Sequence, residues 1–296
     1  MNMNINVSAP TISSAAMLVE LSISFWTARK LDKGTTSDVL YQKQAQRGAG
    51  SFNKNLLVGC DELEAIKKFA GNARTGIHYT MTLPWSDSGL RLLPTSKFFD
   101  YEERMSAMKA EFDRMVEAFI AVYDLEVVAA QARMGSLFDA SEYPSTEKVR
   151  SKFGFRVNYI PMPEVGDWRV DMNNETISSL KSQYGKFYDE QTRRSMSDLW
   201  NKLHTECERF LKQLTIDDDG KKGKLYQSTI DHLSHLADML EAVNFNNDPT
   251  MQLAQRKLKA IVSGLDKDDL VRNPSFREDT KKKMAEAIKA LPSLDM

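Results

Sequence analysis

The feature that most constrains the fold is an apolar repeat that runs from residue 101 to about residue 134. Large apolar side chains recur in it at spacings of three and four: Met105, Met108, Phe112, Met115, Phe119 and Tyr123. This period matches the turn of an α-helix, so the apolar side chains share one face. The sequence therefore predicts a long amphipathic helix, and a helix of this kind needs other elements to cover its apolar face.

The segments on either side of this helix carry strand and turn patterns. β-branched and aromatic residues are frequent in 18–31, which favours a strand over the alternative of a helix. Residues 77–99 surround the turn "PWSDSG", and residues 153–172 hold two strand-like runs, so each segment predicts a β-hairpin. The Gly-rich segment 34–59 predicts a flexible loop, and Asp61 is expected to cap a short helix.

After residue 173 the strand signals stop and three helical stripes follow. Their apolar members are Met196, Leu199, Leu203, Cys207, Phe210 and Leu214, then Leu233, Leu236, Leu240 and Val243, then Leu258, Ile261, Val262 and Leu265. The predicted fold class is α+β and mostly helical, with a small antiparallel sheet and one long helix in the N-terminal half. We expect a flexible arm at 1–16, a mixed α/β domain at 17–172 and a helical region at 173–296, either a bundle or extended helices.

Composition limits the classes of partner. Lys and Arg number 40 against 41 Asp and Glu in 296 residues, so any attraction to nucleic acid must come from a local patch. Cys60 and Cys207 lie far apart, which is typical of a reducing compartment. The sequence contains neither a signal-peptide pattern nor an apolar run of about 18 residues. We therefore expect a cytoplasmic protein without a membrane partner.

Three patterns fall short of a catalytic or metal site. The segment "RGAGSFNKN" lacks the spacing of a phosphate-binding P-loop, and "DDDG" at 217–220 starts like a calcium loop but has no Glu at the twelfth position. His204 and Cys207 have the spacing of zinc ligands, as do His232 and His235, but Cys207 lies on an apolar stripe. The sequence thus predicts no catalytic residue, no cofactor and no metal.

One region is basic within this neutral chain. In 29–54 the basic residues outnumber the acids, and Tyr41 and Phe52 lie among them, with Trp26 just before. The stretch "KVRSKFGFRVNY" at 148–159 is also basic and aromatic. A positive groove with exposed rings is what sequence-tolerant binding of single-stranded DNA requires. The candidate nucleic-acid-binding residues are Arg29, Lys30, Lys33, Lys43, Arg47, Lys54, Arg150, Lys152 and Arg156.

The same residues also have a purely structural interpretation. In it, Trp26, Phe153 and Phe155 belong to the core, and the basic side chains are only solvated. Trp26 then anchors its strand, while Arg29 and Lys30 at the end of that strand remain free to bind. Amphipathic helices in a chain without a catalytic motif favour a protein that works by assembly.

The segments "LVELSISFWTARK", "EFDRMVEAFIAVYD" and "KFGFRVNYIPMP" resemble a family of uncharacterised phage and conjugative-element proteins that is known only as a domain of unknown function. The likeness covers roughly residues 17–165, and the sequence departs from it in the Gly-rich loop at 34–54. The resemblance implies a mobile-element protein in the host cell cytoplasm, encoded among DNA-metabolism genes and near a MoxR-type ATPase with a von Willebrand-type partner. The residues that carry the likeness are Leu21, Trp26, Arg29, Lys30, Phe112, Phe119, Tyr123 and Phe155.

Two functional hypotheses follow. The first is a non-enzymatic phage or mobile-element protein that acts by assembly and protein binding, as an adaptor or structural component, with a MoxR-type AAA+ ATPase as one candidate partner. The alternative is an oligomeric protein that binds or anneals single-stranded DNA in replication or recombination. Both hypotheses expect a homo-oligomer. They differ in salt sensitivity, because only the contact with phosphates weakens steeply as salt rises.

Overall fold

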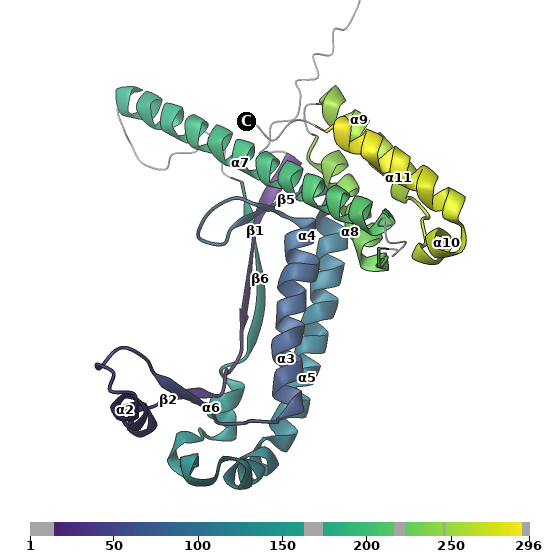
Figure 1. The fold of residues 1–296 in the computed structure, drawn as a ribbon. Coiled ribbons are helices and arrows are strands. Elements are labelled where there is room, and N and C mark those ends of the chain that lie inside the picture. The colour runs from purple at the N-terminus through teal and green to yellow at the C-terminus, as the bar shows by residue number, and fades with distance from the viewer. Residues whose placement is uncertain (1–14, 163–173, 216–222, 245–246, 292–296) are drawn as a thin grey trace, which may run out of the picture. The chain divides into compact units, whose positions relative to one another are not determined.

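The computed structural model describes residues 15–162, 174–215, 223–244 and 247–291 (Figure 1). Contacts group the chain into two compact units that are interleaved along the sequence. Unit 1 comprises Met1–Glu20, Thr75–Glu103 and Asn158–Met296, and unit 2 comprises Leu21–Arg74 and Arg104–Val157. The predicted division of the chain stays a prediction. Its boundary at 172/173 and nearly all of the flexible N-terminal segment predicted at 1–16 lie outside the described residues.

The fold class is α+β and mostly helical, as the sequence predicts. The main sheet has the strand order β4-β5-β1-β6. In it, β5 pairs antiparallel with β1 and with β4, and Leu92 lies opposite both Leu18 and Leu83. The choice of a strand over a helix near the N-terminus is confirmed. The strands of this sheet are β1 Ala16–Ser24, β4 Leu83–Pro84, β5 Arg91–Pro94 and β6 Gly154–Pro161.

The first predicted hairpin is confirmed, with a shorter extent. The turn between β4 and β5 closes when the backbone N–H groups of Trp85 and Ser86 donate to the carbonyl of Leu90. The residues before it are helical and not extended, as a π-helix at Ala73–His78 and then α4 at Tyr79–Met81. The second predicted hairpin supplies β6, which lies beside β1 in the sheet; its other predicted strand lies outside the described residues.

The long helix is α5, Phe98–Met134, as the apolar period predicts. Its large apolar side chains at Met105, Phe112 and Phe119 are buried. A shorter helix, α3, spans Asp61–Asn72, and its N-cap is Cys60 and not Asp61. Asp61 instead lies in the acidic first turn of α3, where a carboxylate interacts favourably with the positive end of the helix dipole.

The prediction of a flexible loop at 34–59 is wrong. The segment contains helix α2, Lys33–Gln42, and strand β3, Phe52–Asn55, which pairs antiparallel with β2, Arg29–Asp32. Asp32 caps α2, because its carboxylate accepts a hydrogen bond of 2.8 Å from the backbone N–H of Thr35. Since α2 has no buried face, its sequence lacks the apolar stripe from which a helix is usually predicted.

The predicted C-terminal helices are present, and their stripes form the core of unit 1. Side chains from the sheet, such as Leu92, pack in the same cluster as Phe210 and Leu233 of the helices. Asp248 and Asn273 are the N-caps of α9 and α11, each followed at once by a proline that suits the first helical turn. The helices are α7 Asn174–Leu214, α8 Gln227–Ala242, α9 Pro249–Val262, α10 Lys267–Arg272, α11 Pro274–Lys289, and in the middle of the chain α6 Thr146–Arg150.

A buried arginine holds the end of α7. The guanidinium of Arg277, on α11, donates hydrogen bonds of 2.9 Å to the carbonyl of Leu214 and 2.7 Å to that of Gln213. A third bond of 3.2 Å reaches the carbonyl of Gly223. The last carbonyls of a helix have no partner within the helix, so this side chain supplies one. Arg277 therefore links α11 to the end of α7 inside unit 1.

Candidate binding surface on the arm

Six of the nine predicted binding residues lie on one small substructure of unit 2. We call residues 29–55, which comprise β2, α2 and β3, the arm (Figure 1). The chain enters it at Ala28, a buried residue with a left-handed φ of 52°. Within the arm, the hydroxyl of Thr36 accepts a hydrogen bond of 2.9 Å from the backbone N–H of Phe52 and so fastens α2 to β3. No side chain of α2 is buried.

Lys54 is a structural residue and not part of the exposed surface. Only 5% of it is exposed, and its ammonium lies 3.2 Å from Asp32 Oδ2 and 2.7 Å from Glu142 Oε2. It also donates a 3.0 Å hydrogen bond to the carbonyl of Leu137. The hydrogen bond to Glu142 is the main reason that the pKa of Lys54 is raised. This part of the prediction is corrected, because the ammonium of Lys54 is already paired with two carboxylates and is not available to a phosphate.

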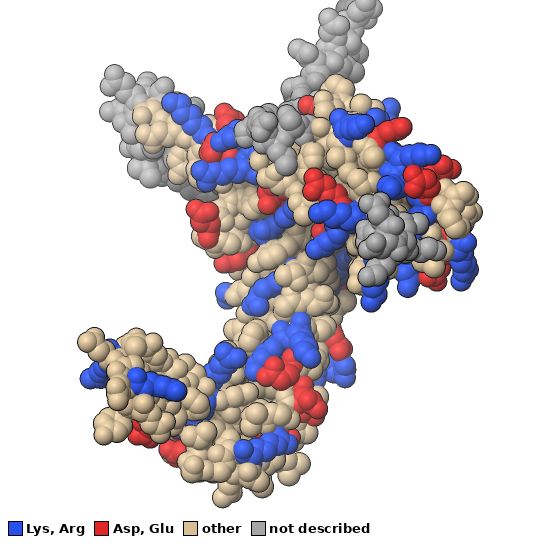
Figure 2. Space-filling view, in the orientation of Figure 1, with Lys and Arg blue, Asp and Glu red and all other residues tan. Residues whose placement is uncertain are grey.

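The other cations of the arm are accessible. Lys30 lies opposite Lys54 in the β2–β3 ladder and 3.7 Å from the carboxylate of Glu142, with about half of its side chain exposed (49%). The remaining four form no ion pair within the part of the chain that the structure describes: Arg29, Lys33, Lys43 and Arg47. Figure 2 shows blue basic side chains on the arm, at the lower left. The arm is therefore a local positive surface on a nearly neutral chain.

Only one of the three aromatic side chains near these cations is available to a ligand. Tyr41, on α2, is 87% exposed. Phe52 is half-buried, and Trp26 is buried with its ring edge-on to Tyr123 at a centroid distance of 5.8 Å. The structure thus places Trp26 where the structural interpretation expects it, in the core of unit 2, and leaves Tyr41 as the exposed ring.

The second basic stretch offers cations but no fully exposed ring, since Phe153 and Tyr159 are half-buried and Phe155 is buried. Arg150 forms an ion pair with Glu117, and Lys152 and Arg156 are exposed. Both neighbouring phenylalanines pack inward against α5: Phe153 against Phe119 and Phe155 against Phe112, each at a ring distance of 5.6 Å. An aromatic wall for stacked bases is therefore not formed by this stretch.

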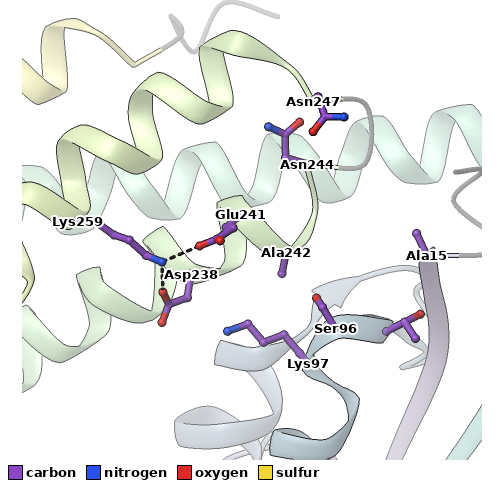
Figure 3. Close-up of a pocket in the computed structure, with 10 residues that line it drawn as sticks. Ala15, Ser96, Lys97, Asp238, Glu241, Ala242, Asn244, Asn247 and Lys259 are labelled. Atoms are coloured by element: carbon purple, nitrogen blue, oxygen red, sulfur yellow. Dashed lines mark hydrogen bonds and ion pairs between the residues drawn. The ribbon is translucent and has the colours of Figure 1, made fainter. Parts of the chain in front are cut away.

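Unit 1 contains a polar cavity of about 610 Å³. Figure 3 shows Lys97, from the segment before α5, and Lys259, on α9, lining it together with acids of α8. The Lys259 ammonium lies 2.6 Å from Glu241 Oε2 and 3.1 Å from Asp238 Oδ1, and the bond to Glu241 is the main cause of its raised pKa. A lysine kept charged in this way is a poor nucleophile or base, so the cavity does not define a reaction.

Unit 1 also contains a buried His78–Tyr101 pair. His78 Nδ1 lies 2.7 Å from the Tyr101 hydroxyl. Burial, helped by the nearby charge of Arg91, lowers the pKa of His78 to about 3. The imidazole is therefore neutral near pH 7, and its tautomer decides whether Nδ1 or the Tyr101 hydroxyl donates the hydrogen bond. Both side chains are enclosed, which gives the pair a role in packing.

The residues considered for zinc do not converge on a site. Among the described residues, no group of three or more His, Cys, Asp or Glu side chains is arranged to hold a metal ion. Cys207 is buried, and desolvation raises the pKa of its thiol to about 12. His232 Nδ1 lies 3.6 Å from Glu206 Oε1.

No helix of the described segments has both the length and the apolar character needed to cross a bilayer.

Comparisons with known proteins leave the class of this protein open. The chain matches no family model, no curated protein and no solved structure. Its functional surfaces must therefore be inferred from its own residues. One such surface was not predicted from the sequence. It is a second set of apolar side chains on α5, in which Leu125 is 71% exposed and Val128 is 69% exposed.

Proposed function

We propose that this protein is non-enzymatic and acts by assembly and protein binding, with the arm as a contact surface. The observation that carries the proposal is that α2 buries no side chain and exposes Val39 and Tyr41. A helix of 10 residues is marginal on its own in water, so a partner that covers α2 would stabilise it. Exposed Tyr and Arg side chains are also the residue types that contribute most to protein interfaces.

The resemblance to phage and conjugative-element proteins supports a role in a mobile element, within the cytoplasm of the host cell. In that setting the protein is an adaptor or structural component that forms a homo-oligomer. A MoxR-type ATPase is a candidate protein partner.

Binding of single-stranded DNA is the second candidate function. It is favoured by the four arm cations that have no ion pair within the described segments, together with the exposed ring of Tyr41. One ring supports one stacked base, worth about 1–3 kcal/mol, whereas the groove envisaged from the sequence needs several rings. Because Trp26 and Phe155 are buried, the arm supports protein contacts better than a track of stacked bases.

Photo-cross-linking tests the first proposal directly. The full chain would carry para-benzoylphenylalanine in place of Tyr41, and a matched control would carry it in place of Phe99, which is also strongly exposed (81%) but lies in unit 1. In the cells that naturally make the protein, we expect protein adducts from position 41 and few from position 99. Nucleic-acid adducts from position 41 would favour the second candidate, and equal adducts from both positions would contradict a role for the arm.

A titration of labelled single-stranded DNA at low and moderate salt tests the second candidate. If the arm binds DNA, the Arg29→Ala/Lys30→Ala variant should bind more weakly and should show a shallower salt dependence, since fewer phosphates are neutralised. Absence of binding at low salt would remove this candidate.

A further inference from the structure

Helix α5 has a second apolar seam, on the side away from its core. The exposed members, which we call the outer seam, are Ala118, Ala121, Leu125, Val128 and Ala132. Their spacing alternates between three and four, as at the a and d positions of a coiled coil. The buried seam of the same helix consists of Phe112, Val116, Phe119 and Tyr123. The outer seam is offset from it by two residues, which is about 200° around the helix axis.

A surface helix normally has one apolar stripe, which faces its own core. The apolar side chains on the opposite side of α5 are therefore unlike those of an ordinary solvated face. Leu125 and Val128 are the largest of them and remain mostly exposed. Burying such side chains stabilises a complex by removing apolar area from water.

The outer seam has an acidic flank. Glu117 and Asp124 precede Ala118 and Leu125 by one residue, which corresponds to the g position of the heptad, and both are exposed. Glu117 already forms an ion pair with Arg150, whereas Asp124 forms none within the described residues, so Asp124 carries the uncompensated charge of this flank. In coiled-coil contacts the charges at these positions select the partner. A partner for this seam should thus combine apolar side chains with positive charge.

We propose that the outer seam of α5 binds the arm of a second copy of this chain. The arm has the required chemistry: Leu31, Val39 and Tyr41 are exposed apolar groups, and Arg29, Lys33, Lys43 and Arg47 are cations without an ion pair within the described residues. The sizes also agree. Helix α2, with 10 residues, is about 15 Å long, and the span 118–132 is about 21 Å.

Contact between two outer seams is disfavoured by the same charges. A two-fold contact would bring the uncompensated carboxylate of Asp124 toward its own copy, where like charges repel. A contact between arm and seam joins two different surfaces, so a pair of copies still has one free arm and one free seam. Such heterologous contacts extend into rings or filaments. This inference rests on the proposed function and names the partner as the chain itself.

The test is a mixing experiment on the full chain, followed by sedimentation velocity over a concentration series. Tyr41→Ala removes the anchor of the arm, and Leu125→Glu places a charge in the seam. Each variant alone should associate at least about 30-fold more weakly than the wild type. An equimolar mixture should form one-to-one dimers and nothing larger, because the intact seam of the first variant meets the intact arm of the second. Phe99→Ala, at an exposed site of unit 1, should assemble like the wild type.

Circular dichroism must show that both variants are folded, which is expected because both positions are exposed. A mixture that stays monomeric while the wild type assembles would overturn the contact between arm and seam. A wild type that stays monomeric at its highest soluble concentration would overturn it as well. If position 41 then cross-links to a different protein, this inference fails while the proposed function stands. Adducts to nucleic acid alone would overturn both.

Discussion

Helices α8 and α2 illustrate two uses of a helix within one chain. Of its 16 residues, α8 buries seven, whereas α2 buries none of its 10. Packing within unit 1 therefore stabilises α8, while α2 depends on its Asp32 cap and on the β2–β3 ribbon. The difference teaches that burial holds α8 in the fold, whereas α2 leaves its side chains exposed, as the proposed contact surface requires.

The same contrast holds for individual residue types. Arg277 and Tyr101 are buried and hydrogen-bonded within unit 1. Arg47 and Tyr41, on the arm, are exposed. Substitutions in matched pairs should therefore lower stability at the first set and change association at the second.

The largest difference is expected between leucine and valine truncations on the two helices. Leu233→Ala, in the core, should lower the free energy of unfolding by about 2–5 kcal/mol, because it leaves a cavity. Val39→Ala, on α2, should change it by less than about 0.5 kcal/mol. Urea unfolding of both variants measures the difference. Comparable losses would show that α2 belongs to the folded core after all.

The second prediction concerns acid stability. His78 has a pKa of about 3 in the folded state and an ordinary value of 6.5 when unfolded, so the unfolded state binds more protons between these pH values. Stability should accordingly fall as the pH drops below 6.5, by up to about 1.4 kcal/mol per pH unit from this group. His78→Asn removes that contribution.

Urea unfolding at pH 7 and pH 5 measures the effect of His78. The two proteins share every other side chain, so the smaller pH dependence of the variant isolates position 78. An unchanged pH dependence would mean that His78 is protonated without opening unit 1.

The third prediction compares two arginines. Arg277→Met should lower the free energy of unfolding by about 1.5–3 kcal/mol, since it removes charged hydrogen bonds to the end of α7. Arg47→Met, on the arm, should leave stability within about 0.5 kcal/mol. Thermal or urea unfolding distinguishes them, and equal effects would contradict the capping role of Arg277.

The smallest effect on stability is expected at Tyr41. Tyr41→Ala should change the free energy of unfolding by less than about 0.5 kcal/mol, because the side chain has few contacts to lose. Its association should nevertheless weaken, as sedimentation velocity can show. A large loss of stability without a change in association would identify Tyr41 as a structural residue and end the contrast between the two helices.

Much of the fold could be predicted because buried stripes leave a period in the sequence. The repeat at 101–134 and the stripes after residue 173 predict α5 and the C-terminal helices, and the turn "PWSDSG" predicts the β4–β5 hairpin. Helix α2 could not be predicted in this way, because an exposed helix lacks a stripe and its boundaries depend on the single cap at Asp32.

The candidate site was only partly predictable. Charge composition identified the basic segment 29–54, and it correctly separated that segment from a neutral chain. It could not show that Lys54 turns inward to Asp32 and Glu142, because Glu142 is remote in sequence. It also could not sort the aromatic residues, since exposure depends on what packs against each ring.

The sequence by itself determined the fold class, the long helix, the apolar stripes and the position of a basic segment. Each of these depends only on local composition or on the spacing of apolar residues. Tertiary structure alone decided which of these groups face solvent. It enclosed Trp26 and Lys54, left Tyr41 exposed, and left the outer seam of α5 uncovered. The physical reason is that burial results from contacts between segments distant in sequence, and no local pattern encodes which segment will cover a given face.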